Sequence, residues 1–258
     1  MSTNLPQSDI LQDLHEQVAL VTGASSGIGA AVARALVQRG ARVALAARRV
    51  DRLQELSEEL ARDWQSEVLA LACDVRSPDD VQAAVRQTLD HWGQLDILVA
   101  NAGFGYRAPL IEGDIDRWKD MIDTNVYGLL LTLKYGVPPM LERGRGHVVV
   151  TSSVSGRVST PGGSAYCGSK FAATAIADAL RQEIGPKGIR VTTIEPGVVI
   201  SEFQEVAGYA PGILENMLKG ATPLVPDDIA RAVIFAVEQP AHYGVTEIVV
   251  RPTGQAFP

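Results

Sequence analysis

The sequence is poor in cysteine and in clustered positive charge, and it has no long apolar run. Each shortage excludes a class of protein. Two cysteines in 258 residues argue against a disulfide-stapled secreted domain and fit a reducing compartment such as the cytoplasm. A net charge of −7, with no basic run longer than Arg48-Arg49, argues against nucleic acid as a partner. No stretch of eighteen apolar residues occurs, so we expect no membrane span.

The beginning of the chain also lacks the features of a targeting signal. Residues 1–17 are polar and acidic, without a basic start or an apolar centre, so we expect no secretory signal peptide. We interpret 1–16 as an N-terminal arm, either mobile or forming a short added helix, and 17–258 as a single domain. The four histidines are scattered without ligand spacing, so we expect no metal site.

Short apolar runs alternate along the chain with longer amphipathic segments. The runs predict strands at 18–22, 42–47, 68–73, 95–100, 147–151, 190–194 and 247–250. The amphipathic segments predict helices at 27–39, 51–63, 78–91, 114–141, 163–185 and 226–238. Most runs are continuously apolar, which is typical of strands buried on both faces of a parallel sheet. We therefore predict one doubly wound α/β domain with right-handed crossovers. The irregular segment at about 198–225 is interpreted as a substrate-loop insertion, because insertions of this kind often act as lids.

Tyr166 and Lys170 form a first candidate for chemistry. Their spacing of four places both side chains on one helix face, about 6 Å apart along the axis. A neighbouring ammonium favours the phenolate, so we expect Lys170 to lower the pKa of Tyr166 from its free value of about 10. Ser153, thirteen residues upstream at a strand end, is placed to hold a substrate oxygen. This is the outline of a proton-transfer site for carbonyl or alcohol chemistry, although Tyr-x-x-x-Lys alone is common on ordinary helices.

A glycine-rich turn supplies the partner that this pair needs. Residues 22–29 read Thr-Gly-Ala-Ser-Ser-Gly-Ile-Gly, directly after the first predicted strand and at the start of the first helix. Because glycine has no side chain, the backbone of the turn can approach a pyrophosphate closely. The partial positive charge of the helix N-terminus attracts the negative charge of the pyrophosphate. The spacing is G-x-x-x-G-x-G and no Gly-Lys-Ser/Thr follows, so the turn is not a P-loop. At this place in a βαβ series it predicts a nucleotide site.

The ordered motifs together resemble the short-chain dehydrogenase/reductase family over about residues 17–252. They are TGASSGIG at 22–29, CDV at 73–75, NAG at 101–103, Asn125 in Thr-Asn-Val-Tyr-Gly, Ser153, Tyr166-x-x-x-Lys170 and Pro196-Gly197. The resemblance implies a Rossmann-type, seven-stranded parallel sheet in the order 3-2-1-4-5-6-7 and a nicotinamide-dependent oxidoreductase. It also implies a homotetramer or homodimer that assembles through the helices holding Asn125 and Tyr166 and through the last strand.

The resemblance assigns a role to each of four candidate catalytic residues. Tyr166 is the general acid in reduction and the base in oxidation, and Lys170 lowers its pKa and binds the nicotinamide ribose. Ser153 holds the carbonyl oxygen; the family's thirteen-residue interval to the tyrosine selects it over Ser152. Asn125 sits in a helix break and anchors a water that relays protons to Lys170.

The resemblance also implies a set of cofactor-binding residues, from the glycine turn, the ends of three further strands, the catalytic helix and the stretch after the sixth strand. They are Gly23, Ser25, Ser26, Gly27, Ile28, Gly29, Arg48, Arg49, Asp74, Val75, Asn101, Ala102, Gly103, Tyr166, Lys170, Pro196, Gly197, Val199 and Ser201. Relatives that use NAD end the second strand with an aspartate for the ribose 2′-hydroxyl. Here Ala47 is followed by two arginines, which can pair with a 2′-phosphate, so the predicted cofactor is NADP(H).

The substrate is weakly encoded. Candidate pocket walls on loops expected around the nicotinamide are Phe104, Tyr106, Val154, Arg157, Pro161, Phe203 and Tyr209. Arg107 or Arg157 either binds a substrate carboxylate or only braces a loop, and both interpretations stay open. The predicted function is interconversion of a small carbonyl compound and its alcohol. The stretch 226–254 resembles a branch of NADP-dependent 3-hydroxy-acid, serine and sulfoacetaldehyde-type enzymes. Oxidation of a 3-hydroxy acid or related hydroxy compound as the main direction is therefore one alternative. A catalytically silent NADP-binding regulator is an alternative of another class.

Overall fold

A parallel sheet of seven strands forms the centre of the computed structural model, which describes residues 11–209 and 212–255. The strands are β1 (Val18–Thr22), β2 (Arg42–Ala47), β3 (Val68–Ala72), β4 (Ile97–Ala100), β5 (Gly146–Thr151), β6 (Ile189–Pro196) and β7 (Glu247–Val250). Their order, β3-β2-β1-β4-β5-β6-β7, confirms the predicted Rossmann-type topology. The order reverses between β1 and β4, and in open α/β sheets such a switch point opens a crevice at the carboxyl ends of the strands.

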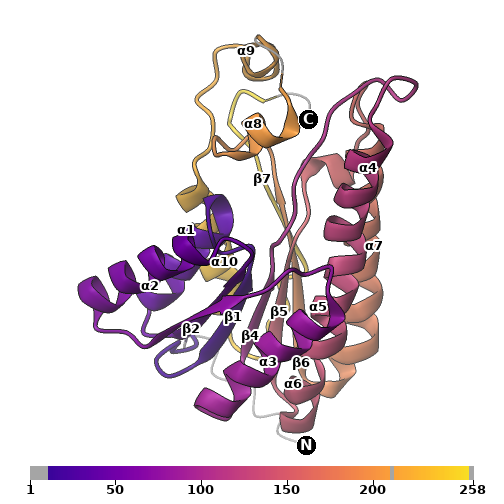
Figure 1. Ribbon diagram of the computed structural model, residues 1–258. Coiled ribbons are helices and arrows are strands. Elements are labelled where there is room, and N and C mark those ends of the chain that lie inside the picture. Colours follow the sequence, from indigo (N-terminus) through magenta and orange to yellow (C-terminus); the bar gives the residue numbers. More distant parts are fainter. Residues whose placement is uncertain (1–10, 210–211, 256–258) are drawn as a thin grey trace, which may run out of the picture.

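Helices cover both faces of this sheet (Figure 1). One face carries α1 (Gly27–Val37), α2 (Val50–Trp64) and α10 (Pro226–Val237). The other carries α3 (Pro78–Trp92), α5 (Gly128–Gly136), α6 (Pro138–Arg143) and α7 (Ser164–Ile184). Shorter elements are α4 (Ile115–Ile122), α8 (Phe203–Ala207), α9 (Ile213–Leu218) and the single turns η1 (Asp123–Tyr127), η2 (Val154–Gly156) and η3 (Gly185–Lys187). None of the helices in the described part of the chain is long and apolar enough to cross a membrane.

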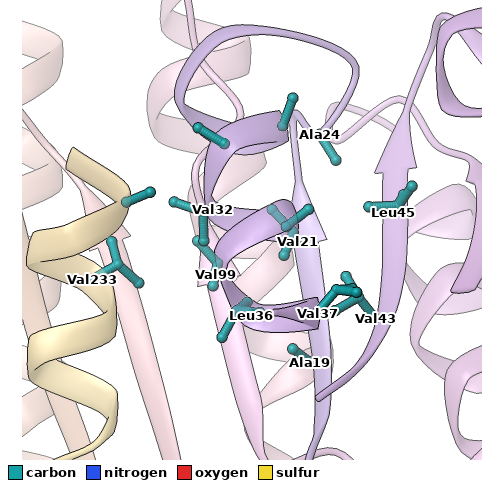
Figure 2. Close-up of a cluster of buried hydrophobic side chains, with 14 of the residues drawn as sticks. Ala19, Val21, Ala24, Val32, Leu36, Val37, Val43, Leu45, Val99 and Val233 are labelled. Carbon is teal, nitrogen blue, oxygen red and sulfur yellow. The ribbon is translucent and has the colours of Figure 1, made fainter. Parts of the chain in front are cut away.

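Buried aliphatic side chains hold α1 against the sheet and against α10. Figure 2 shows Val32 and Leu36 of α1 close to Val99 of β4 and Val21 of β1, with Val233 of α10 on the side of Val32 and Val99 away from Val21. Each of these five side chains is fully excluded from solvent. Because α1 is the helix that follows the glycine turn, this packing fixes the turn over the carboxyl end of β1.

The prediction of one continuous helix at 114–141 is wrong. The structure divides it into α4, η1, α5 and α6. The interruption at η1 is a π-turn centred on Asn125, whose buried side chain bonds the backbone of Phe104 and the hydroxyl of Ser169. Pro138 starts α6 at a first-turn position, where its missing N–H costs no helix hydrogen bond. The helical periodicity runs through both interruptions, so it could not show them.

The described part of the predicted N-terminal arm packs onto the domain. Leu14 is 2% exposed, and the backbone N–H of Gln12 donates to the carbonyl of Glu238 at 2.6 Å. Residues 11–16 are not helical. The remainder of the arm, 1–10, lies outside the described residues.

The segment at 198–225 forms a separate lobe beyond the end of β6, at the top of Figure 1, and contains α8 and α9. A parallel bridge between Val199 and Leu224 closes its base. Residues 210–211 within the lobe lie outside the described residues. The lobe is therefore an insertion that leaves the sheet and returns to it at neighbouring points.

Replacing Leu36 with alanine should destabilise the domain by about 2–5 kcal/mol, because the cavity opens between α1 and the sheet. The matched control is Leu110→Ala, since Leu110 is 61% exposed where Leu36 is fully buried. That control should cost less than about 0.5 kcal/mol. Urea unfolding followed by circular dichroism measures both, and similar losses for the two variants would contradict this account of the core.

Candidate active site

A cleft of about 520 Å³ runs across the carboxyl ends of β1 to β6, as the switch point predicts. All but two of the predicted site residues line it. The exceptions are Gly29 and Asn125, which lie behind the wall and support it. The structure therefore brings together segments that are far apart in the sequence, from Gly23 to Ser201.

The glycine turn forms the floor of one half of the cleft. Gly23 and Gly27 have φ of +69° and +54°, a conformation that other L-residues rarely adopt. A Cβ at Gly29 would lie 2.3 Å from the carbonyl oxygen of Gly23 and 2.7 Å from Nδ2 of Asn101. No side chain caps the first turn of α1, where Ser26 is the N-cap. The backbone N–H groups there remain directed at the cleft, which fits a pyrophosphate.

Thr22 joins this turn to the end of β4. Its hydroxyl donates to the carbonyl of Val99 at 3.2 Å and accepts from the backbone N–H groups of Asn101 and Ala102 at 3.1 and 3.2 Å. The side-chain amide of Asn101 in turn donates to the carbonyl of Thr22 at 3.2 Å. These bonds place the Asn-Ala-Gly motif directly beside the turn.

Asp74 lies on the cleft wall after β3 and is held by a residue that the motif analysis missed. Nη2 of Arg76 donates to Oδ2 of Asp74 at 2.7 Å, and Nε donates to Oδ1 at 3.0 Å. These hydrogen bonds lower the pKa of Asp74 and keep its carboxylate charged. Arg76 itself lines the cleft. An arginine two residues after an aspartate is too common in loops to attract notice.

Ser153, Tyr166 and Lys170 converge at the other half of the cleft. Ser153 is buried, and its Oγ accepts from the backbone N–H of Ser155 at 3.1 Å. Nζ of Lys170 donates to the carbonyl of Thr151 at 3.0 Å and lies 6.0 Å from the centre of the Tyr166 ring. The three side chains thus share one end of the cleft. Ser153 lies two residues after the end of β5, and Tyr166 and Lys170 lie on the first turns of α7.

The electrostatics of this trio differ from the expectation. Burial raises the pKa of Tyr166 above its ordinary value, and a hydrogen bond with Ser153 opposes the rise. Burial also lowers the pKa of Lys170 to about 8. The predicted lowering of the pKa of Tyr166 is therefore not found, because the effect of burial outweighs that of the polar groups around the phenol.

Asn125 connects the trio to the loop after β4. Its Oδ1 accepts from the N–H of Phe104 at 3.0 Å, and its Nδ2 donates to the carbonyl of Phe104 at 2.9 Å and to Oγ of Ser169 at 3.0 Å. A void of about 10 Å³ is lined by Asn125, Thr151 and Lys170 among others. That size corresponds to about one water molecule.

The wall beside Tyr166 is apolar and uncharged. It is formed by Phe104, Val154, Phe203, Val206, Tyr209 and Met217. The ring of Phe203 lies 5.6 Å from that of Tyr166 and 6.4 Å from that of Tyr209. Val206 and Met217 were missed by sequence reasoning, since aliphatic residues in an insertion carry no distinguishing pattern.

Four of the other substrate-side candidates do not line the cleft: Tyr106, Arg107, Arg157 and Pro161. Arg157 forms ion pairs with Glu195 of β6 and Glu247 of β7, so it braces the sheet edge and is not available to a substrate. Burial raises the pKa of Glu195, and the Arg157 guanidinium opposes that rise. Arg107 donates to the carbonyl of Pro161 at 2.9 Å and stacks on Tyr209.

Tyr106 is the last of these candidates. Its ring lies under Arg117, 4.2 Å from the guanidinium carbon, and its hydroxyl accepts from the N–H of Asp114. It therefore stabilises the loop before α4 and does not form part of the cleft wall.

Gln255 is a further cleft residue without a sequence signal. Its side chain is buried, and its Oε1 accepts from the N–H of Val198 at 3.0 Å. Gly197 leaves it room, since a Cβ there would lie 2.3 Å from the same oxygen. The C-terminal stretch therefore fixes the backbone between Pro196 and Ser201.

Comparison with known proteins agrees with this geometry. The short chain dehydrogenase family model matches residues 17–209. The chain belongs to the short-chain dehydrogenase family. It is 42% identical over 240 residues to the glycine betaine reductase of Emericella nidulans, covering 93% of this chain and 19% of that longer protein.

Two solved structures of dehydrogenases are also similar. The alcohol dehydrogenase of the archaeon Thermococcus sibiricus, complexed with 5-hydroxy-NADP, superposes with a TM-score of 0.85 and 34% identity, covering 95% of this chain and all of that one. The closed form of a serine dehydrogenase complexed with NADP+ has a TM-score of 0.87 and 32% identity, covering 93% of this chain and 97% of that one. Within residues 11–209 and 212–255 of this short-chain dehydrogenase, no three His, Cys, Asp or Glu side chains are grouped as a metal site requires.

Gly29→Ala should raise the Kd for NADPH at least about tenfold, equivalent to about 1.4 kcal/mol, because the added Cβ displaces the carbonyl of Gly23. Gly168→Ala is the control, since nothing lies within 4 Å of a Cβ at that position in α7. Fluorescence titration with NADPH measures both. Equal affinities for the two variants would show that the turn does not bind the cofactor.

Proposed function

We propose that this protein is an NADP(H)-dependent oxidoreductase that interconverts an uncharged carbonyl compound and its alcohol by hydride transfer. The observation that carries the proposal is the meeting of Ser153, Tyr166 and Lys170 at one end of a cleft whose other end has the form of a dinucleotide site. Chemistry of this type needs orientation, a polarising donor and a proton source from the protein, and the trio offers all three.

The residues present fit a bound dinucleotide phosphate. Gly29 and Gly23 leave backbone where any side chain would collide, and the first turn of α1 is uncapped. Arg48 and Arg49 line the mouth of the cleft after Ala47, where an aspartate would repel a 2′-phosphate. The NADP complexes of the two similar dehydrogenases support the same choice. When bound, the nicotinamide supplies or accepts the hydride.

In the direction of reduction, the hydroxyl of Ser153 holds the carbonyl oxygen while Tyr166 gives its proton to that oxygen. The raised pKa of Tyr166 does not oppose this step, because an alkoxide is a stronger base than a phenolate. Lys170 is held by Thr151 and lies close enough to stabilise the phenolate left behind. Asn125 then lines the route by which a water returns a proton to this lysine. Oxidation of the alcohol uses the same groups in reverse.

The neutral wall around Tyr166 favours an uncharged substrate over a 3-hydroxy acid. Its side chains are aliphatic or aromatic, and both candidate arginines are engaged elsewhere. A carboxylate entering this end would lose its hydration, and Arg107, which stacks on Tyr209, already donates to the carbonyl of Pro161. No observation favours the alternative of a silent NADP-binding regulator, since such a protein has no need of the four candidate catalytic residues.

We further propose that the enzyme is a homotetramer in the cytoplasm. Large apolar side chains are exposed on two separate outer surfaces, at Tyr127, Leu130 and Phe171 of η1, α5 and α7 and at Phe235 and Val249 of α10 and β7. Exposed apolar surface of this kind marks protein contacts. The location is supported by Cys73 and Cys167, which are both free and buried.

Tyr166→Phe should lower kcat about 10²- to 10⁴-fold, because the proton donor is lost while the ring is kept. NADPH oxidation over a panel of ketones, aldehydes, keto acids and β-keto esters measures it, and the uncharged members should be the best substrates of the unaltered enzyme. The Kd for NADPH should change little. Undiminished turnover in the variant would overturn the mechanism, and NADPH binding without turnover in the unaltered protein would favour the regulator.

Light scattering should give the mass of four chains. Phe171→Glu should reduce that mass, because the charge enters a surface that we assign to subunit contact. Trp64→Glu, on the opposite face of the sheet, is the control: the two aromatic side chains are similarly exposed, at 45% and 50%. A monomeric unaltered protein would refute the assembly.

A further inference from the structure

Arg49 is the centre of a polar cluster that joins three separate parts of the cleft. Its Nε donates to Oγ of Ser25 at 3.2 Å, and its Nη2 donates to Oγ of Ser26 at 2.6 Å. Its Nη1 donates to Oε2 of Glu202 at 2.8 Å. One guanidinium thus links the end of β2, the glycine turn and the start of the insertion at 198–225.

Glu202 is the acidic member of this cluster. It is the N-cap of α8 and lines the cleft, directly before Phe203, whose ring packs against Tyr166. Its hydrogen bond with Arg49 lowers the pKa of Glu202, so the carboxylate is charged at neutral pH. The side chains of both partners are 45% exposed, so solutes can reach the ion pair.

The carboxylate of Glu202 lies where a second anion, the 2′-phosphate of NADP(H), is expected. Arg48 and Arg49 are the cations that a 2′-phosphate would meet at the mouth of the cleft. The guanidinium of Arg49 already donates through each of its three nitrogens. A phosphate that takes the bond at Nη1 must displace the carboxylate or lie beside it, and two anions at that distance repel each other.

We propose that Glu202 sets cofactor preference by competing with the 2′-phosphate of NADP(H) for Arg49. This inference rests on the proposed NADP(H) function. Binding of NADP(H) exchanges the carboxylate for phosphate on the guanidinium and releases the start of α8 beside Tyr166. NAD(H) carries a neutral 2′-hydroxyl that donates to the carboxylate, so it leaves the ion pair in place. Glu202 therefore reduces the ratio of the affinity for NADP(H) to the affinity for NAD(H). It also makes the position of α8 depend on which cofactor is bound.

The experiment compares Glu202→Gln with Glu205→Gln. Glu205 is the matched control, because it lies one turn further along the same helix, is exposed and does not line the cleft. Thermal unfolding first establishes that both variants fold. The Kd values for NADPH and NADH are then measured by fluorescence titration without substrate, at low and high salt.

Glu202→Gln should lower the Kd for NADPH about three- to tenfold and leave the Kd for NADH unchanged or raised. The difference should shrink at high salt, since the ion pair is exposed to screening. Glu205→Gln should leave both values within about twofold of the unaltered protein.

Three results overturn the proposal. If Glu202→Gln raises the Kd values for NADPH and NADH by the same factor, Glu202 only holds the insertion closed. If both Kd values of that variant are unchanged and the unaltered protein binds NADPH normally, Glu202 does not compete with the 2′-phosphate. The proposed function would then still stand. If the unaltered protein binds no NADPH, the proposed function fails first and this inference fails with it.

Discussion

The hydroxyl of Thr22 ties the end of β1 to the end of β4, and the cleft depends on this contact. It bonds three backbone groups of β4 and the residues that follow, and so sets how closely the glycine turn approaches Asn101. The absence of side chains at Gly23 and Gly29 makes the approach possible. If the two strand ends separated, the turn that is the floor of the dinucleotide half would lose its position. The switch point of the sheet is thus held by particular bonds as well as by topology.

The two halves of the cleft differ in their exposure to water. Lys170 and Ser153 are buried, and burial shifts the pKa of the lysine and that of Tyr166 in the directions that favour the uncharged forms. In such surroundings a small displacement of a proton or a charge has a large energetic effect. At the mouth, the side chains of Arg49 and Glu202 are half exposed, so the attraction between them is weak. In the proposed function, proton transfer takes place in the more buried half and cofactor selection at the exposed mouth.

Several features of the structure follow from local sequence. Each apolar run predicted as a strand is a strand, with ends displaced by two residues at most, because burial on both faces demands continuous apolar residues. The glycine turn and the Tyr166–Lys170 pair lie where their spacing indicates, since each is contained in a single short segment. Interruption of the helix at Asn125 was implied only by family resemblance, because the bonds that hold the π-turn come from Phe104 and Ser169.

By itself, the sequence determined the strand and helix pattern, the glycine turn and the residue types available for proton transfer. Tertiary structure alone decided which charges meet. Arg157 was a substrate candidate until Glu195 and Glu247 were seen to engage it from two strands. Glu202 gained importance only because folding brings it to Arg49, 153 residues earlier. The physical reason is range: periodicity and spacing report backbone geometry over a few residues, whereas an ion pair depends on distance in space.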